Sequence, residues 1–324
     1  MIYLQNNLIM KKFFLKIYDK NAESAVFDIL NTYEEKWYAW INFMYFAYIK
    51  AQKLYLTKIT AHQHKWKLRI KLKKKLKKIF DDFDINTRYS KIFPDKQNIL
   101  LWGLIKNKYA DYHNAIIQAD FLFADGIALQ LSYFLLKLFK KIPNIKNKKY
   151  RVHNLNGTDF LPYFFSELID RYGSHKINVI LYGSYPEYVK KTEEYFKHKW
   201  IHVIYSQDGY SEFDRWLLKN KLDEYQDKIN ILLVARSLPQ IPVQELWVYN
   251  NQEKIQKHEL ITFTVWWLFD HLIWVQRRAP KILRVIKLEW FWRLITHPKR
   301  NYKKVLNIFS GLKYIFCYLL LKTQ

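Results

Sequence analysis

Three short apolar runs, separated by segments of helical spacing, constrain the fold of this chain more than any other feature. The runs are Ile177–Tyr182, Ile201–Tyr205 and Ile229–Ala235, and the segments between them are Pro186–His198 and Asp214–Gln226. Strands that are apolar on both faces and alternate with helices are typical of a parallel sheet covered by helices on both sides. We therefore predict an α/β protein with a Rossmann-like, largely parallel sheet as its core.

Ligands of such sheets bind beyond the carboxyl ends of the strands, where loops and helix N-termini gather. Three segments follow the predicted strands directly: Gly183-Ser184, Asp208-Gly209-Tyr210 and residues 236–244. Each segment alone is typical of an ordinary turn. Their shared position at one edge of the sheet favours a binding site.

Two acidic segments elsewhere precede apolar, helix-like stretches. Asp125 and Gly126 end the run FLFA, and apolar neighbours raise the pKa of a carboxyl group, which suits a proton acceptor. The alternative is a helix N-cap, which composition alone favours. Gly157 and Asp159 lie in NGTD, where Gly157 permits close approach of the backbone and Thr158 or Asp159 caps a helix. Free N–H groups at this helix start would bind an anion. The alternative is that the segment is only a loop with a cap.

The charge of the chain predicts an anionic partner. It has 54 Lys and Arg against 29 Asp and Glu, a net charge of +25, and 18% aromatic residues. Nucleic acid, acidic lipid headgroups and a phosphorylated substrate all fit this balance. Nine of the residues from Lys65 to Lys78 are basic, which indicates either a basic amphipathic helix on lipid or nucleic acid, or a solvated helix face. We assign no metal site to the acidic residues 81–84, because no strand precedes them.

The segment 277–300 combines eight Lys or Arg with a single acid and many apolar residues. Pro280 suits a helix start, and Ile282, Ile286, Trp290 and Leu294 recur every four residues on one face. Such a helix would rest on anionic lipid and hold a diphosphate. The alternative is that the apolar stripe packs on the core.

The remaining features concern location and domain organisation. Cys317 is the single cysteine, so no intrachain disulfide forms and a cytoplasmic setting is the default expectation. The first residues lack the order of a signal peptide, and no apolar run reaches the roughly 18 to 20 residues of a spanning helix. We predict a helical, basic N-terminal extension over 1–95 that includes the apolar stretch Trp37–Ile49, an α/β core over 96–275, and a basic helical C-terminal appendage over 276–324.

Seven blocks of sequence resemble a known enzyme family in their order and rough spacing. They are ADGIALQ at 124–130, NGTDFLP at 156–162, LYGSYPEYV at 181–189, QDGY at 207–210, IPVQELW at 241–247, FDHLIWVQRRAP at 269–280 and LEWFWRLITHPKR at 288–300. Over residues 97–305 the chain is similar to the WecG/TagA/CpsF bacterial glycosyltransferases, glycosyltransferase family 26.

The resemblance implies an inverting, metal-independent transfer without a cofactor. A sugar, often of the N-acetylmannosamine type, moves from a UDP-sugar to a polyprenyl-diphosphate-linked acceptor in cell-surface polysaccharide synthesis. The expected location is the cytoplasmic face of the cell membrane, as a peripheral protein. The expected partners are this donor, this acceptor, an anionic membrane surface and, as one option, a second copy of the chain; nucleic acid is not expected.

The resemblance also implies roles for individual residues. Asp125 would be the catalytic base that deprotonates the acceptor hydroxyl, and Gln244 would contact the substrate. The residues expected to bind substrate with it are Glu245, Arg151, Gly157, Asp159, Gly183, Ser184, Asp208, Gly209, Tyr210 and Asp270. Those expected to engage diphosphate and membrane are Arg278, Arg284, Arg293 and Arg300.

The chain departs from the family pattern at four places. Arg151 lies six residues before Gly157, farther than the usual Arg, and Trp274 or Val275 replaces a glycine. The usual Thr-x-Asn element has no counterpart that we can place in LLWGLIKNKYAD, and ARSLP at 235–239 replaces a Gly-rich segment. The identity of the sugar therefore does not follow from the resemblance. Two alternatives stay open from the sequence: a basic nucleic-acid-binding protein, and a degenerate transferase that serves as a membrane scaffold.

Overall fold

A computed structural model gives the architecture of much of the chain. It describes residues 16–45, 114–139, 152–211, 213, 220–225, 227–236, 243–265, 268–273, 279–280, 282–283, 288–296, 298 and 302. The basic run Lys65–Lys78, the acidic residues 81–84 and Cys317 lie outside these ranges.

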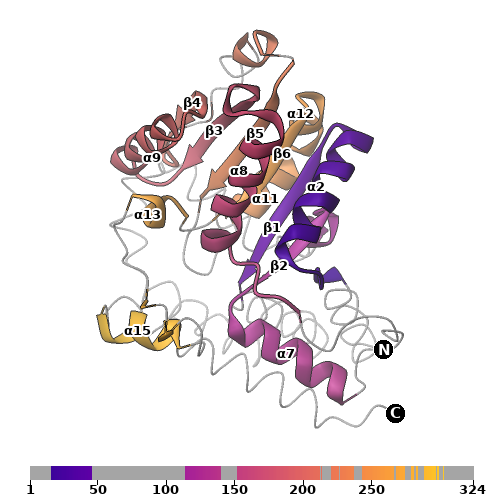
Figure 1. The fold of residues 1–324 in the computed structure, drawn as a ribbon, viewed down its shortest axis with the longest axis vertical. Helices are drawn as coiled ribbons and strands as arrows, with labels where there is room; N and C mark the ends of the chain where they lie inside the picture. The colour runs from indigo at the N-terminus through magenta and orange to yellow at the C-terminus, as the bar shows by residue number, and fades with distance from the viewer. Residues whose placement is uncertain are drawn as a thin grey trace, which may run out of the picture.

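The core is a six-stranded sheet (Figure 1). Its strands are β1 (Ala39–Tyr45), β2 (Phe121–Asp125), β3 (Ile177–Gly183), β4 (His202–Gln207), β5 (Ile229–Ala235) and β6 (Leu260–Thr264). Their order is β2-β1-β6-β5-β3-β4, and every neighbouring pair is parallel. The predicted α/β class with a Rossmann-like parallel sheet is confirmed.

The three apolar runs of the sequence form β3, β4 and β5, within one or two residues of their predicted bounds. The predicted helix Pro186–His198 is α9. Of the predicted helix Asp214–Gln226 the structure describes residues 220–225, of which 220–223 are helical. These elements follow the sequence closely because each strand is apolar on both faces and is bounded by polar turns.

Helices cover both faces of the sheet (Figure 1). On one face lie α2 (Ala22–Lys36), α8 (Gly157–Tyr172), α9 and α13 (Leu268–Leu272), packed on residues such as Ile41, Val179 and Phe263. On the other lie α11 (Val243–Asn250) and α12 (Gln252–Lys257), packed on Ile180 and Leu232. Successive residues of each strand therefore serve opposite cores, as the alternation of side chains in a strand requires.

Part of the N-terminal region belongs to this core. We predicted a helix within Trp37–Ile49, but Ala39–Tyr45 is β1 and pairs with β2 on one side and β6 on the other. A short, wholly apolar run fits a buried strand and a buried helix equally well, and here pairing on both edges selects the strand. Residues 22–45, which we placed in an N-terminal extension, thus contribute α2 and β1 to the sheet layers; the rest of that division stays a prediction.

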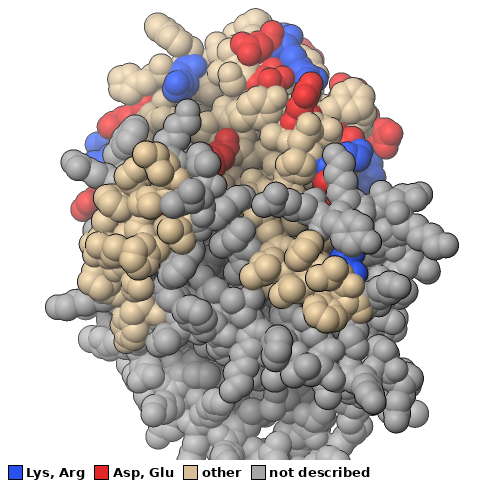
Figure 2. All heavy atoms as spheres, turned by 60° about the horizontal axis from the view of Figure 1, so that its bottom comes forward, with Lys and Arg blue, Asp and Glu red and all other residues tan. Residues whose placement is uncertain are grey.

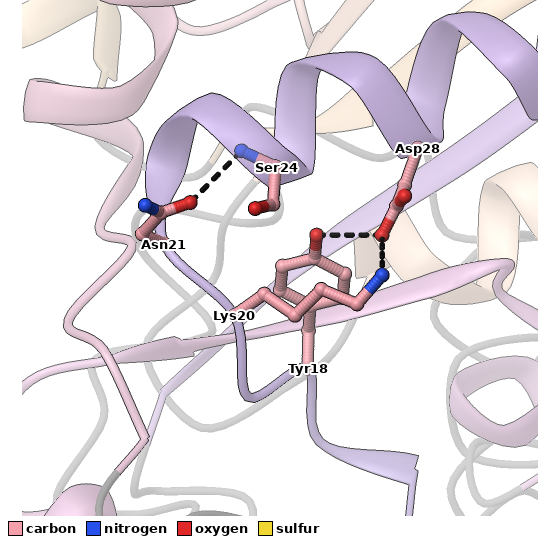
Figure 3. Close-up of polar contacts among 5 residues, drawn as sticks. All are labelled: Tyr18, Lys20, Asn21, Ser24 and Asp28. Atoms are coloured by element: carbon pink, nitrogen blue, oxygen red, sulfur yellow. Dashed lines mark hydrogen bonds and ion pairs between the residues drawn. The ribbon is translucent and has the colours of Figure 1, made fainter.

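Polar contacts attach the segment before α2 to the sheet and to the helix (Figure 3). The Asn21 side chain caps α2 by accepting from Ser24 N at 2.9 Å. Tyr18 Oη and Lys20 Nζ both donate to Asp28 Oδ2, at 2.8 and 2.7 Å. Because Tyr18 N also donates to the carbonyl oxygen of Leu122 in β2, this segment is bonded to both layers.

Two further helices lie at the carboxyl end of the sheet: α7 (Ile127–Leu138), which follows β2, and α15 (Glu289–Thr296) (Figure 1). The predicted continuous helix from Pro280 to Leu294 is wrong, because Leu288 is not helical and its N–H donates to the carbonyl oxygen of Leu283 at 2.8 Å. This bond spans five residues and closes a wider turn than the α-helix uses, so α15 starts separately. Among the described residues, no helix is long and apolar enough to cross a membrane.

Candidate active site

The carboxyl ends of β3 and β5 form the first cluster of candidate residues. The chain leaves β3 toward α9 on one face of the sheet and leaves β5 toward α11 on the other face. Such a divergence between neighbouring parallel strands opens a crevice, which is the usual binding position of open α/β sheets.

Backbone packing at Gly183 sets the geometry of this crevice. Gly183 has φ +123, and an added Cβ would lie 2.4 Å from the backbone carbon of Ala235. Ser184 follows in the left-handed region with φ 61, and its N–H donates to the carbonyl oxygen of Ala235 at 3.0 Å. A non-glycine residue in this region is uncommon, and such strained positions cluster at functional sites.

The loop after β4 packs against this turn. Gly209 N donates to the carbonyl oxygen of Ser184 at 3.0 Å, and a Cβ on Gly209 would meet the Gly183 backbone at 3.2 Å. Asp208 Oδ1 accepts from Tyr210 N at 2.7 Å and from Ser211 N at 3.0 Å. The carboxylate of Asp208 thus shapes its own loop, and that loop lies directly over the β3 turn.

Arg236 is a cationic member of the cluster. It begins the segment 236–244 that the sequence placed at this edge of the sheet, although it was given no individual role there. Its Nη2 donates to the carbonyl oxygen of Gly209 at 3.2 Å, and its guanidinium carbon lies 5.0 Å from the centre of the Tyr182 ring. A carbonyl and an aromatic face thereby orient a half-buried positive charge between β3, β4 and β5. The sequence feature that points to Arg236 is its position as the first residue after β5.

A second cluster lies at the end of β2. Asp125 is the last residue of this strand, and Gly126 N donates to Asn154 Oδ1 at 2.9 Å. Asp125 is not the N-cap residue of α7, because that position is taken by Gly126, which has no side chain to accept a capping hydrogen bond. Gly126 has φ 96 and ψ 155, a backbone conformation that glycine adopts readily, and it turns the chain from β2 into α7.

The NGTD segment adjoins this cluster, since Leu155 N donates to the carbonyl oxygen of Ala124 at 3.1 Å. Asn156, rather than Thr158 or Asp159, is the N-cap of α8, and its Oδ1 accepts from Asp159 N at 3.0 Å. Asn156 Nδ2 in turn donates to Asp159 Oδ2 at 2.8 Å. The Asp159 carboxylate is therefore part of the helix start.

Gly157 is buried at the start of α8 and faces the Phe43 ring of β1. An added Cβ would lie 3.4 Å from that ring, which is an ordinary van der Waals contact, so packing alone does not require glycine here.

Gln244 and Glu245 open α11 and are both buried. Gln244 Nε2 donates to Glu245 Oε1 at 3.0 Å. Burial of a carboxylate and an amide costs free energy unless the groups are hydrogen-bonded. A buried Gln–Glu pair is therefore unusual at a position that serves packing alone. Asp270 is also buried, but it lies in α13 against the opposite face of the sheet.

The structure thus brings together Gly183, Ser184, Asp208, Gly209 and Tyr210, and separately Asp125, Gly157 and Asp159. The strands β1 and β6 lie between β2 and β5, which places the two strand ends about 14 Å apart at the usual strand spacing. Arg151, Arg278, Arg284 and Arg300 lie outside the described residues. Arg293 lies in α15, but its side chain is outside the description.

Comparison with known families completes these observations. Residues 97–323 match the profile of the family described as Glycosyl transferase WecG/TagA/CpsF family. The match covers well over half of the chain and includes both clusters, all strands except β1, and α15. The chain belongs to the WecG/TagA/CpsF family of glycosyl transferases.

Proposed function

We propose that the protein transfers a sugar from a UDP-sugar to a polyprenyl-diphosphate-linked acceptor, with inversion at the anomeric carbon. Family membership supplies the class, a glycosyltransferase of cell-surface polysaccharide synthesis. The observation that carries the finer proposal is the position of Asp125, which ends an apolar strand on the same sheet edge as the β3–β5 crevice. The sugar is of the N-acetylmannosamine type or related to it.

The crevice between β3 and β5 suits the nucleotide half of the donor. Gly183 and Gly209 let the turn after β3, the end of β5 and the loop after β4 pack closely together, and Arg236 supplies a positive charge for a diphosphate. The Tyr185 ring is exposed and lies 5.3 Å from the Tyr210 ring, which offers an aromatic face to the uracil base. Gln244 and Glu245 would contact the substrate from the start of α11.

The second cluster suits the transfer step. Asp125 takes the proton of the acceptor hydroxyl while the hydroxyl oxygen attacks the anomeric carbon from the face opposite the leaving group. The bond between that carbon and the diphosphate oxygen breaks, and UDP leaves with the electron pair. Arg278, Arg284, Arg293 and Arg300 of the C-terminal appendage would neutralise the charge that develops on the diphosphate.

The lipid-linked acceptor requires contact with a membrane. A net charge of +25 attracts anionic headgroups, and the eight basic residues of 277–300 concentrate part of that charge in the appendage. We therefore propose peripheral attachment at the cytoplasmic face of the cell membrane.

Replacement of the proposed base tests this function. Asp125→Asn keeps the shape of the side chain but removes the proton acceptor, so turnover should fall roughly 10²–10⁴-fold. The measurement is UDP release with a panel of UDP-sugars and a short polyprenyl-diphosphate-linked sugar as acceptor. Asp120→Asn is the matched control, because Asp120 lies at the amino end of the same strand and should leave turnover near that of the wild type.

Undiminished turnover of folded Asp125→Asn would reject the assignment of the base. Absence of turnover by the wild type with every UDP-sugar of the panel would instead favour the membrane scaffold.

A further inference from the structure

The helix α7 has an exposed apolar stripe. Leu131, Phe134, Leu138 and Phe139 are 41%, 39%, 53% and 55% exposed. Leu131, Phe134 and Leu138 are three and four residues apart and lie on one side of the helix, and Phe139 follows as its C-cap. A helix on the surface of a soluble protein normally presents polar residues to solvent. The exposure of these apolar side chains on α7 is therefore unusual.

The inward face of α7 is mixed. The buried residues on it are Leu129, Gln130, Ser132, Tyr133, Leu136 and Lys137. Gln130 Nε2 donates to the carbonyl oxygen of Val152 at 2.6 Å, and burial raises the pKa of Tyr133 to about 12, with a smaller contribution from Asp19. The hydrogen bond of Gln130 and the burial of the inward side chains thus fix the orientation of α7, even though the helix exposes leucine and phenylalanine on its other side.

The stripe lies beside the proposed transfer site. α7 begins at Ile127, two residues after Asp125, at the carboxyl end of the sheet. α15 lies at the same end of the molecule and exposes Phe291 and Ile295, one helical turn apart (Figure 1). Figure 2 turns this end forward: the described surface there is largely uncharged, and the described acidic side chains gather mainly toward the upper rim.

We propose that the α7 stripe, Leu131, Phe134, Leu138 and Phe139, inserts into the headgroup–acyl boundary of an anionic bilayer, with α15 as a second contact. The inference rests on the proposed function in one respect, the lipid-linked acceptor. Insertion of α7 holds the end of β2 at the membrane surface, where the polyprenyl chain stays in the bilayer while the acceptor sugar reaches Asp125.

The net charge of the chain favours a bilayer over a second copy of the chain as the partner of the α7 stripe. Two chains that each carry +25 repel one another, whereas anionic headgroups attract the same charge. The exposed apolar side of α7 would be buried in the membrane interface, while the basic residues that attract the headgroups lie mainly outside this helix.

Vesicle co-sedimentation of the full chain, without substrates, tests the proposal. The double variant Phe134→Ser/Phe139→Ser should bind vesicles of phosphatidylglycerol and phosphatidylcholine about tenfold more weakly or worse, because membrane affinity scales with buried apolar area. Phe134→Leu/Phe139→Leu should retain binding. The matched control is Trp37→Ser/Trp200→Ser, which removes two exposed aromatic residues that lie two positions before β1 and β4, at the opposite end of the sheet.

Equal binding by the serine variant and the wild type would overturn the proposal, as would equal losses in the control variant. Light scattering supplies a second criterion. If the wild type is a dimer and the serine variant is a monomer, the stripe binds a second copy of the chain and the proposal is overturned. UDP release by the wild type is measured in parallel. Vesicle binding through α7 without any UDP-sugar turnover would reject the proposed function and support the membrane contact.

Discussion

Glycine backbone geometry shapes both clusters of the candidate site. At Gly183 a positive φ and contact with the Ala235 backbone bring β3 and β5 to a close junction, over which the Asp208 loop lies. At Gly126 a positive φ turns the chain from Asp125 into α7, with open space around the Cβ position. Both glycines thus have a positive φ that other residues rarely adopt, but neighbouring atoms approach the Cβ position closely only at Gly183.

This difference predicts unequal costs of substitution. Gly126→Ala places a side chain in a backbone region that alanine adopts at a cost of about 1–3 kcal/mol. Gly183→Ala has the same strain and also a steric overlap, since its Cβ would lie 2.4 Å from the Ala235 carbon and 2.5 Å from the Ala235 oxygen. Urea denaturation should therefore show a larger loss of unfolding free energy for Gly183→Ala. Equal losses would mean that the β3–β5 junction relaxes at no cost.

At the scale of elements, buried polar pairs mark the register of otherwise apolar strands. Thr264 Oγ1 in β6 donates to Asn42 Oδ1 in β1 at 2.7 Å, and Asn178 Nδ2 in β3 donates to Asn230 Oδ1 in β5 at 2.9 Å. Both pairs are direct register partners in the sheet. An apolar strand shifted along its neighbour would separate these groups and leave them buried without a partner, which disfavours the shift.

A double-mutant cycle on β1 and β6 tests this role. Thr264→Val removes the donor to buried Asn42 and should cost about 1–3 kcal/mol of unfolding free energy. Asn42→Val/Thr264→Val removes both polar groups and should cost less than the sum of the two single changes. Urea denaturation of the four proteins gives the coupling free energy. A coupling near zero would show that the pair makes no net contribution.

At the scale of the whole molecule, the family-matched segment and the folded core have different limits. The match begins at residue 97, but β1 at 39–45 lies inside the sheet, between β2 and β6. α2 adds Val26, Ile29 and Leu30 to the same core. The N-terminal residues 22–45 therefore take part in the structural unit that carries the candidate site.

A fragment of residues 97–324 should accordingly fail to fold by itself. Without β1, the strands β2 and β6 each lose a hydrogen-bonded neighbour, and one face of the sheet loses α2. Unpaired strand edges promote aggregation, so the fragment should elute as aggregates in gel filtration. Co-expression of residues 1–60 should increase the soluble fraction. Cooperative unfolding of the isolated fragment, with the midpoint of the full chain, would contradict this expectation.

The sequence by itself determined the parallel α/β class, the strands β3, β4 and β5, and helix α9. These elements could be predicted because their apolar pattern and polar boundaries lie within short segments. The turns after β3 and β4 could also be predicted as one cluster, since parallel strands carry their carboxyl ends to the same edge of the sheet.

Other features were decided only by tertiary structure. Ala39–Tyr45 is a strand because β2 and β6 pair with it, and those strands lie far along the chain. The sequence placed Arg236 at the sheet edge, but its contact with the carbonyl oxygen of Gly209, in a different loop, follows only from the fold. The helix α7 is so rich in apolar residues that its composition does not identify a buried face. Contacts with distant residues, such as Val152, select that face and leave the stripe beside Asp125 exposed.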